Sequence, residues 1–416
     1  MFSGVSLAFA SWQASTVCKF FYIMSDIGFD VDVLLVVEAD IATTQLTEQL
    51  LSECLAFGIR YKKLYLSQLD EHAFTGAALP LFVRTADPVA IYWMEALKRS
   101  NIPYFYYIDD NFWLIGGDSP LAKYYKHPII RRSLKFAVEN AHTVITNSVA
   151  LREYILPKNK NTMLLPAFFD FSLLPVCDSK PVDEYRIGFA GSASRDADLD
   201  ILKDVIPYFL NRRDNLAFEF IGCLPKWLEQ GPKVRFFGHM HSYAEYIAFQ
   251  ATRSWKIGLA PLDNKTSNKY KTNNKYREYS AFRCAGVYSV SESYVDSVVD
   301  GVTGLLVETN TTESWISAIE RYLDDESSRA EIVEKAYNDV HSRFDISAVA
   351  TQWAALFQQG GKLLTNSRIT PVHVSAWDGL VRRLSHYWLL IEISMYEGGF
   401  KLTSYRVLKK ILRLFK

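Results

Sequence analysis

Four lysines followed by one glutamate stand out in the second half of this 416-residue chain. They lie in a loop that follows a short apolar strand, 257–260, and no acid occurs from 264 to 277. The lysines are Lys265, Lys269, Lys271 and Lys275, and the acid that follows them is Glu278. A helix N-terminus adds its dipole and free N–H groups to such charges, which suits an anionic ligand. Because a carboxylate accepts hydrogen bonds from sugar hydroxyls, the pattern indicates a nucleotide-sugar site; a solvated basic loop is the alternative.

A turn of small residues with the sequence GFAGSASRD is a second candidate for binding phosphate. Gly191 and Ser192 let the backbone approach a phosphate closely, and the Arg195 guanidinium can clamp it. Such turns also start many ordinary helices, with Asp196 or Asp198 as the N-cap. The turn and the lysine loop lie in the same half of the chain, which favours a donor-binding role for both.

Two adjacent carboxylates, Asp109 and Asp110, follow an apolar strand in the first half of the chain. At the carboxyl end of a strand they can hold acceptor hydroxyls or act as a base. They can equally be metal ligands or form a capping and turn device. A hard cation needs more oxygen ligands than one pair supplies, and no second acidic cluster is visible in the sequence. We therefore expect a catalytic or acceptor-binding pair, without a metal.

The acceptor side has two further candidates. His127 follows the acidic pair in the sequence Tyr-Lys-His-Pro, although a lone histidine is more often structural. The loop with Ser11, Trp12 and Gln13 comes after the first expected strand and faces the cleft by its position. No G-x-S-x-G elbow, Walker A sequence or G-x-G-x-x-G fingerprint occurs.

The composition is that of a globular protein, with 49% hydrophobic and 22% charged residues. Lysine plus arginine and aspartate plus glutamate both number 46, so any basic patch is local and no nucleic-acid partner is expected. The five cysteines form no C-x-x-C pair, which fits a reducing compartment. The apolar N-terminus lacks a basic region ahead of it, and no stretch is long enough to cross a bilayer.

Apolar runs alternate with amphipathic stretches, which predicts parallel βαβ units. The expected strands are Val5–Ala10, Val31–Val37, Leu64–Leu66, Leu81–Val83, Tyr104–Ile108, Thr143–Thr146, Arg186–Phe189, Ala217–Ile221, Val234–Phe236, Ile257–Ala260, Val287–Val290 and Gly304–Val307. The expected helices are Val17–Ile27, Thr44–Phe57, Ala90–Ser100, Pro128–Asn140, Leu199–Arg212, Ser242–Thr252, Tyr279–Ala285, Thr312–Leu323, Ser327–Arg343 and Ile346–Leu356.

Periodicity is lost near 173–181, where two prolines occur. We predict an α/β chain with an acceptor-side Rossmann-like domain at 1–177, a donor-side Rossmann-like domain at 178–360 and a helical tail at 361–416. A cleft between two such domains is the expected ligand site.

The last sixteen residues, 401–416, contain six basic residues and no acid, with apolar residues at helical spacing. A basic amphipathic helix of this kind suits an anionic membrane surface. Packing of its apolar face on the protein body is the alternative.

These motifs resemble those of GT-B glycosyltransferases, specifically the family-four-like enzymes that build bacterial surface polysaccharides. The resemblance rests on the strand-GFAGS turn, IGLAPL, Lys-x-x-x-Lys-Tyr-x-Glu-Tyr-x-Ala and Asp-Gly-x-Thr-Gly-Leu-Leu-Val. It implies that Glu278 binds the nucleotide ribose and that Arg195, Lys271 and Lys275 hold the diphosphate. One departure matters: many members carry another glutamate eight residues before this one, and here that position is Tyr270.

The implied activity is transfer of a hexose or deoxyhexose from a nucleoside-diphosphate sugar to a hydroxyl of a lipid-linked surface glycan. A retaining reaction lets the leaving phosphate take the acceptor proton, whereas an inverting one would need Asp109 or Asp110 as base. The resemblance implies no cofactor beyond the sugar donor, a cytoplasmic location on the inner face of the plasma membrane, and possible partner glycosyltransferases. A nucleotide-sugar 2-epimerase of the same fold and a non-catalytic member of an assembly complex are the alternatives.

Overall fold

The computed structural model describes residues 31–74, 78–117, 120–175, 184–192, 195–240, 242–263, 268–364 and 375–414. The expected strand Val5–Ala10, the expected helix Val17–Ile27, the loop residues Ser11, Trp12 and Gln13, and Lys265 of the lysine loop lie outside these residues.

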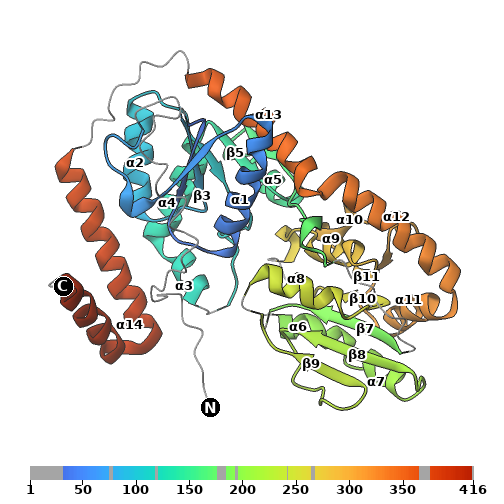
Figure 1. Cartoon of the computed structure of the whole chain (residues 1–416). Coiled ribbons are helices and arrows are strands. Elements are labelled where there is room, and N and C mark those ends of the chain that lie inside the picture. The colour runs from blue at the N-terminus through green and yellow to red at the C-terminus, as the bar shows by residue number, and fades with distance from the viewer. Residues whose placement is uncertain are drawn as a thin grey trace.

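Two parallel sheets, each with six strands in the described part of the chain, form the centres of two α/β units (Figure 1). The first has the order β2-β1-β3-β4-β5-β6 and the second the order β12-β11-β10-β7-β8-β9. The strands are β1 Val33–Val37, β2 Tyr61–Tyr65, β3 Leu79–Val83, β4 Phe105–Tyr107, β5 Thr143–Thr146, β6 Thr162–Leu164, β7 Tyr185–Ala190, β8 Leu216–Ile221, β9 Val234–Phe237, β10 Ile257–Ala260, β11 Ala285–Ser289 and β12 Leu305–Val307. The predicted arrangement of two Rossmann-like domains is confirmed.

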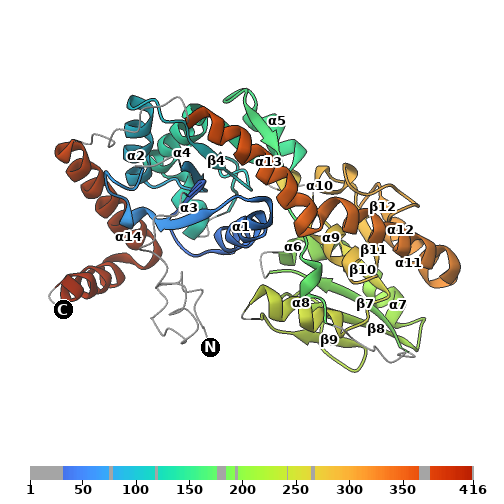
Figure 2. The same cartoon turned by 45° about the horizontal axis from the view of Figure 1, so that its top comes forward.

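Helices flank both sheets (Figures 1 and 2). In and around the first unit they are α1 Ala42–Glu53, α2 Pro88–Arg99, α3 Pro120–Lys126, α4 Pro128–Asn140 and α5 Val149–Ile155. In the second unit they are α6 Asp196–Leu199, α7 Val205–Leu210, α8 Tyr243–Ala251, α9 Asn274–Ala281, α10 Glu292–Val295, α11 Thr312–Asp324 and α12 Glu326–Phe344. Two more follow, α13 Ile346–Leu364 and α14 Ala376–Leu414, and short 3-10 turns η2 Cys54–Phe57, η3 Leu66–Gln68, η4 Phe171–Leu173, η6 Asp200–Leu202 and η7 Asn268–Tyr270 join several elements. No helix in the described part of the chain is long and apolar enough to cross a membrane.

The second sheet positions the candidate donor site. Its central strands β7 and β10 are neighbours. From β7 the chain continues to β8 on one side, and from β10 it continues to β11 on the other side. Ligands of doubly wound sheets bind at the carboxyl ends of strands at this switch point. Gly191 directly follows β7, and the lysine loop follows β10, so both candidate motifs start from the same edge.

The helix that carries Glu278 begins earlier than predicted. The expected helix Tyr279–Ala285 was wrong in its bounds: α9 spans Asn274–Ala281, and Ala285 begins β11. The helix also ends earlier than predicted, because Arg283 has a positive φ that stops the helix. The small residues after it are then free to form the strand. Lys275 and Glu278 therefore lie on α9 itself, whereas Lys271 lies ahead of it.

Helix α13 packs on the first unit, although residues 346–360 were expected to belong to the second. Its Trp353 and Phe357 join the core cluster of the first sheet. Gly360 allows the close approach, because a Cβ there would lie 2.6 Å from a methyl carbon of Leu79. The chain thus crosses between the units a second time, and Phe169 on the first crossing exchanges backbone hydrogen bonds with Phe344 (2.7 Å) and Ile346 (3.1 Å) on the second. The domain boundaries themselves stay predictions.

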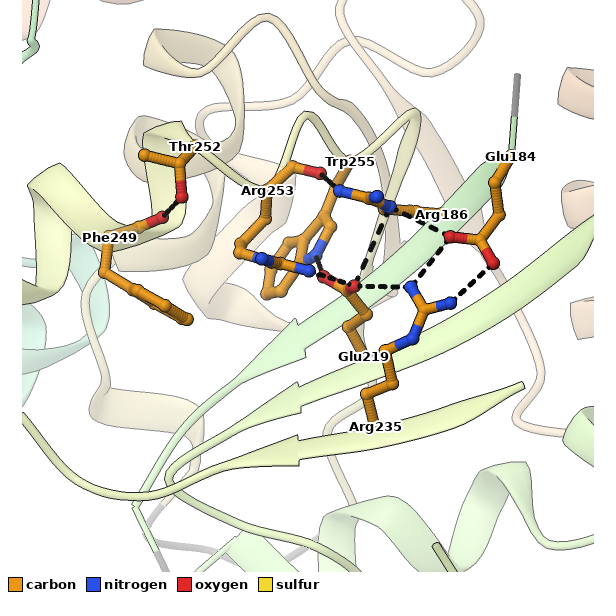
Figure 3. Close-up of polar contacts among 8 residues, drawn as sticks. All are labelled: Glu184, Arg186, Glu219, Arg235, Phe249, Thr252, Arg253 and Trp255. Carbon is orange, nitrogen blue, oxygen red and sulfur yellow. Dashed lines mark hydrogen bonds and ion pairs between the residues drawn. The ribbon is translucent and has the colours of Figure 1, made fainter. Parts of the chain in front are cut away.

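A buried carboxylate ties together the outer strands of the second sheet (Figure 3). Glu219 on β8 is fully buried and accepts hydrogen bonds from Arg253 at 2.6 and 2.9 Å, from Arg235 at 3.2 Å and from the indole of Trp255 at 2.8 Å. Burial raises its pKa, but the bonds from Arg253 and Trp255 outweigh burial, and the net pKa is lowered. Gly188 makes room for this network, since a Cβ there would lie 1.9 Å from the Trp255 ring. The first glycine of GFAGS thus serves packing.

Candidate active site

One cavity of about 430 Å³ lies between the two units and is lined by both. From the sites predicted on sequence it contains Asp109, Asp110, Gly191, Ser192, Arg195, Lys271, Lys275 and Glu278. Residues separated by up to 169 positions in the sequence thus meet around one space. A concave site with a few convergent charged groups is the expected form of a small-molecule site.

Arg195 is held in place by a buried aspartate. Its Nη1 donates to Asp198 Oδ2 at 2.9 Å and to Asn268 Oδ1 at 3.4 Å. Asp198 is itself buried and accepts from the backbone N–H of Asp263 at 3.1 Å. Burial raises the pKa of Asp198, yet this N–H and Arg195 more than compensate and the pKa is lowered. The alternative N-cap role is wrong for both Asp196 and Asp198, because Arg195 stands at the N-cap of α6 and no side chain caps it.

Lys271 contributes a second cation next to Arg195. Burial is the main reason that its pKa falls from the ordinary 10.5 to about 8, and repulsion from Arg195 adds to it. Asp198 and Asp110 act in the opposite direction. Two adjacent cations that repel each other in a partly buried cleft are stabilised by an anionic ligand between them.

Donor binding should therefore weaken in mild alkali. As the pH rises through about 8, Lys271 loses its proton and with it one positive charge facing the ligand. We expect the KM for the donor to be lowest below pH 8 and to rise above it, in initial-rate measurements across that range. Lys271→Arg, whose guanidinium stays charged, should flatten the alkaline rise. An unchanged rise in this variant would assign the effect to another group.

Glu278 lines the cavity and is nearly fully buried. Its Oε2 accepts hydrogen bonds from Lys275 Nζ at 2.7 Å and from Tyr246 Oη at 3.0 Å. Lys275 thus forms an ion pair with Glu278, one helical turn away, and lines the cavity. These two hydrogen bonds fix the position of the carboxylate.

The acidic pair lies on the opposite wall, after β4. Asp109 accepts from Thr43 Oγ1 at 2.6 Å and forms an ion pair with Arg84, whose Nε lies 3.3 Å from Oδ1. Asp110 accepts at 2.8 Å from the backbone N–H of Asn111. Burial, followed by repulsion from Asp109, raises the pKa of Asp110. Because Asp109 forms an ion pair with Arg84, Asp110 is the better placed proton acceptor.

His127 does not reach the cavity lining. Its Nδ1 accepts from the backbone N–H of Ile129 at the start of α4, and its Nε2 lies 2.5 Å from Glu392 on α14. The acceptor-side assignment of His127 is not supported by this position, because both ring nitrogens serve structural contacts.

Tyr270, at the position where a second glutamate was expected from the resemblance, points into the first unit. Its ring packs edge-on against Tyr154 with centroids 5.6 Å apart, within the core cluster of the first sheet. Its carbonyl accepts from Ser148 Oγ at 3.1 Å. Here the residue joins the two units rather than contributing to the cavity. Lys269, next to it, pairs with Glu292 at 3.1 Å.

Several residues that line the cavity were not predicted from the sequence: Thr43, Tyr107, Asn147, Tyr243, Arg277 and Trp353. Arg277 is the most consequential, since it is buried and burial lowers its pKa. Its guanidinium donates to Asn273, Asn274 and the carbonyl of Phe168 on the crossing segment. Its position next to Glu278 in the sequence could have pointed to a site role. Its contact with the carbonyl of Phe168, 109 residues away, could not be predicted from the sequence.

Comparison with known proteins identifies the second unit. Residues 184–325 match the family described as Glycosyl transferases group 1. The chain is a glycosyltransferase. No curated protein sequence matches this chain.

Solved structures show that its fold is GT-B. Sucrose-phosphate synthase from Thermosynechococcus elongatus superposes with a TM-score of 0.58 at 15% identity, covering 79% of this chain and 98% of that one. HepE from Anabaena, in complex with UDP, has a TM-score of 0.58 at 13% identity, covering 79% and 99%. A glycosyltransferase from Rickettsia africae has a TM-score of 0.56 at 12% identity, covering 82% and 100%. At these identities the likeness establishes the fold of this glycosyltransferase, as the resemblance of its motifs implied.

Proposed function

We propose that this glycosyltransferase transfers a hexose or deoxyhexose from a nucleoside-diphosphate sugar to a hydroxyl of a growing, lipid-linked bacterial surface glycan. The observation that carries the donor part is the convergence of Arg195, Lys271 and Glu278 on one side of a single cavity. Two cations and one fixed carboxylate are the groups that a diphosphate and an adjoining ribose require. The binding of UDP by HepE, a structure of the same fold, supports this donor class.

The groups divide the reaction between the two walls. Arg195 and Lys271 stabilise the negative charge that develops on the leaving diphosphate. Glu278 accepts hydrogen bonds from the ribose hydroxyls and thereby orients the donor. In the retaining reaction that we propose, the bond from the anomeric carbon to the diphosphate breaks and a bond to the acceptor oxygen forms on the same face. The acceptor proton passes to the leaving phosphate oxygen.

Asp109 and Asp110 then bind the acceptor on the opposite wall. In an inverting reaction Asp110 would instead take the proton, because its pKa is raised and its carboxylate lines the cavity. The anomeric configuration of the product separates the two routes. The acceptor is proposed as lipid-linked because the basic residues of 401–416 suit an anionic inner membrane surface.

The donor assignment is tested with UDP-, GDP- and dTDP-sugars and a lipid-linked acceptor. We expect release of one nucleoside diphosphate that depends on the acceptor and is accompanied by a longer glycan. Conversion of the donor sugar to its 2-epimer without acceptor would contradict transfer and support an epimerase. Absence of any turnover with the whole panel would favour a non-catalytic role.

Glu278→Gln tests the ribose contact. Hydrogen bonds to a charged group are worth enough that we expect kcat/KM to fall by roughly 10- to 100-fold. Binding of a dideoxyribose analogue of the nucleoside diphosphate should be equal in the variant and the parent, because the hydroxyls that Glu278 contacts are missing. Glu292→Gln, a surface glutamate on α10, is the matched control and should leave turnover unchanged. Equal loss for the ribose and dideoxyribose ligands would mean that Glu278 acts only through the structure.

A further inference from the structure

Helix α14 packs on the first unit with its polar face. Arg382 pairs with Glu95 at 2.9 Å, and His386 contacts Asp87 at the N-cap of α2. Farther along, Glu392 lies 2.5 Å from His127. Of the apolar side chains described on α14, only Leu389 is buried. Polar contacts and the buried Leu389 thus join α14 to the first unit, whereas its other described apolar side chains are half-buried or exposed.

The outward face of α14 is an unbroken apolar stripe. Trp377 is 71% exposed, Leu384 59% and Trp388 61%. With Val381 and Met395, also exposed, they lie within about 40° of one line along the helix at 100° per residue. The docked Arg382 and His386 lie on the opposite side. Exposed apolar patches of this extent mark a surface that is covered by a partner or a membrane.

Charge identifies the occupant. Residues 376–416 contain eight Lys and Arg and three Asp and Glu, a net charge of +5 (8 − 3). Helix α3, which packs against α14, adds two lysines and no acid. Two copies of such a helix would repel each other, whereas anionic lipid headgroups attract it. Tryptophan and tyrosine are the residues enriched at the membrane–water interface.

Helix α14 has two arms, and the basic residues of 401–416 follow the first arm in the sequence. Gly399 has φ of +66°, which breaks the helical path and divides α14 into two arms (Figure 1). Arg406 on the second arm donates to Ser394 on the first at 3.3 Å, so the arms are packed together. In both views α14 lies on the side of the first unit that faces away from the second (Figures 1 and 2).

We propose that the outward face of the first arm, 377–395, inserts into the headgroup–acyl boundary of a membrane that contains anionic phospholipid. The second arm supplies the electrostatic attraction. This inference deepens the peripheral association proposed above and names the residues that make it, while it does not depend on the sugar-transfer chemistry. It also places the first unit, which holds the proposed acceptor side, next to the membrane.

The test is vesicle co-sedimentation of the full chain, with phosphatidylcholine alone or mixed with phosphatidylglycerol. We expect binding to the mixed vesicles, and quenching of tryptophan fluorescence by brominated lipid. The triple variant Trp377→Ser, Leu384→Ser, Trp388→Ser should bind roughly a hundredfold more weakly, because three large apolar side chains no longer enter the lipid. The matched control is Leu55→Ser with Val299→Ser, which are 51% and 58% exposed elsewhere, and it should bind like the parent.

Two outcomes would overturn the proposal. Unchanged binding of the triple variant would assign all membrane contact to 401–416, which a truncation after Phe400 would then abolish. A parent that is dimeric in sedimentation velocity and becomes monomeric in the triple variant, without vesicle binding, would make the stripe a self-interface. Donor turnover with a soluble acceptor, measured in parallel, should be equal in the triple variant and the parent. If the parent showed no donor turnover with the soluble acceptor, this would contradict the proposed function but not the proposal that residues 377–395 insert into a membrane.

Discussion

Replacing Lys271 with alanine should lower kcat/KM by about 10²- to 10³-fold, the usual effect of removing one preorganised group that stabilises transition-state charge. Lys271 is suited to this because it is partly buried beside Arg195, where a charge interacts strongly. The effect should appear in the KM for the donor and also in kcat, since Lys271 faces the donor anion and charge on the leaving diphosphate grows in the transition state. Initial rates at saturating acceptor separate kcat from KM.

Lys269 is the matched control for this prediction. It lies two residues away on the same loop, but its Nζ pairs with Glu292 on α10 and does not line the cavity. Lys269→Ala should retain turnover within about twofold, as expected for an exposed pair of small net worth. If both alanine variants lost activity equally, the loop would act through its overall charge and not through Lys271.

Replacing Glu219 with alanine should destabilise the second unit by about 3–5 kcal/mol, the range for removing one partner of a buried ion pair. Three guanidinium groups, those of Arg186, Arg235 and Arg253, would be left around a site without its carboxylate. Urea unfolding followed by tryptophan fluorescence measures the loss, because Trp255 donates to the same carboxylate.

Glu184 provides the control for this network. It also pairs with Arg235, at 2.7 Å, but it is partly exposed, so Glu184→Ala should cost about 1 kcal/mol or less. Because the pKa of Glu219 is lowered in the folded chain, its contribution is complete above the ordinary value of 4.5 and disappears as the pH falls through the lower folded value. A similar stability loss for both variants would contradict the importance of burial.

The sequence was sufficient for elements with strong apolar patterns and clear end signals. Thr143–Thr146, Ile257–Ala260 and Pro128–Asn140 have the predicted bounds, the last because Pro128 stands at the first helical position. The donor residues also converge as expected, since parallel strands bring the loops after β7 and β10 to one edge.

What the sequence did not reveal depends on partners far along the chain. His127 was predicted as a site residue, but it contacts Glu392, which lies 265 positions later in the sequence. Tyr270 stood in a loop of charged residues, yet its ring packs in the core of the other unit. Strand β6 was not predicted, because its three residues are too few to show an apolar pattern. The polar inner face of α14 was missed because helical spacing alone does not tell which face is covered.

The most direct test of the central claim is to map where a nucleoside diphosphate binds. We predict that one of UDP, GDP or dTDP binds the full chain and protects 191–198 and 268–278 from hydrogen exchange, with protection lost in the Arg195→Ala, Lys271→Ala double variant. Protection confined to other segments, or undiminished protection in the double variant, would contradict the donor site described between the two units.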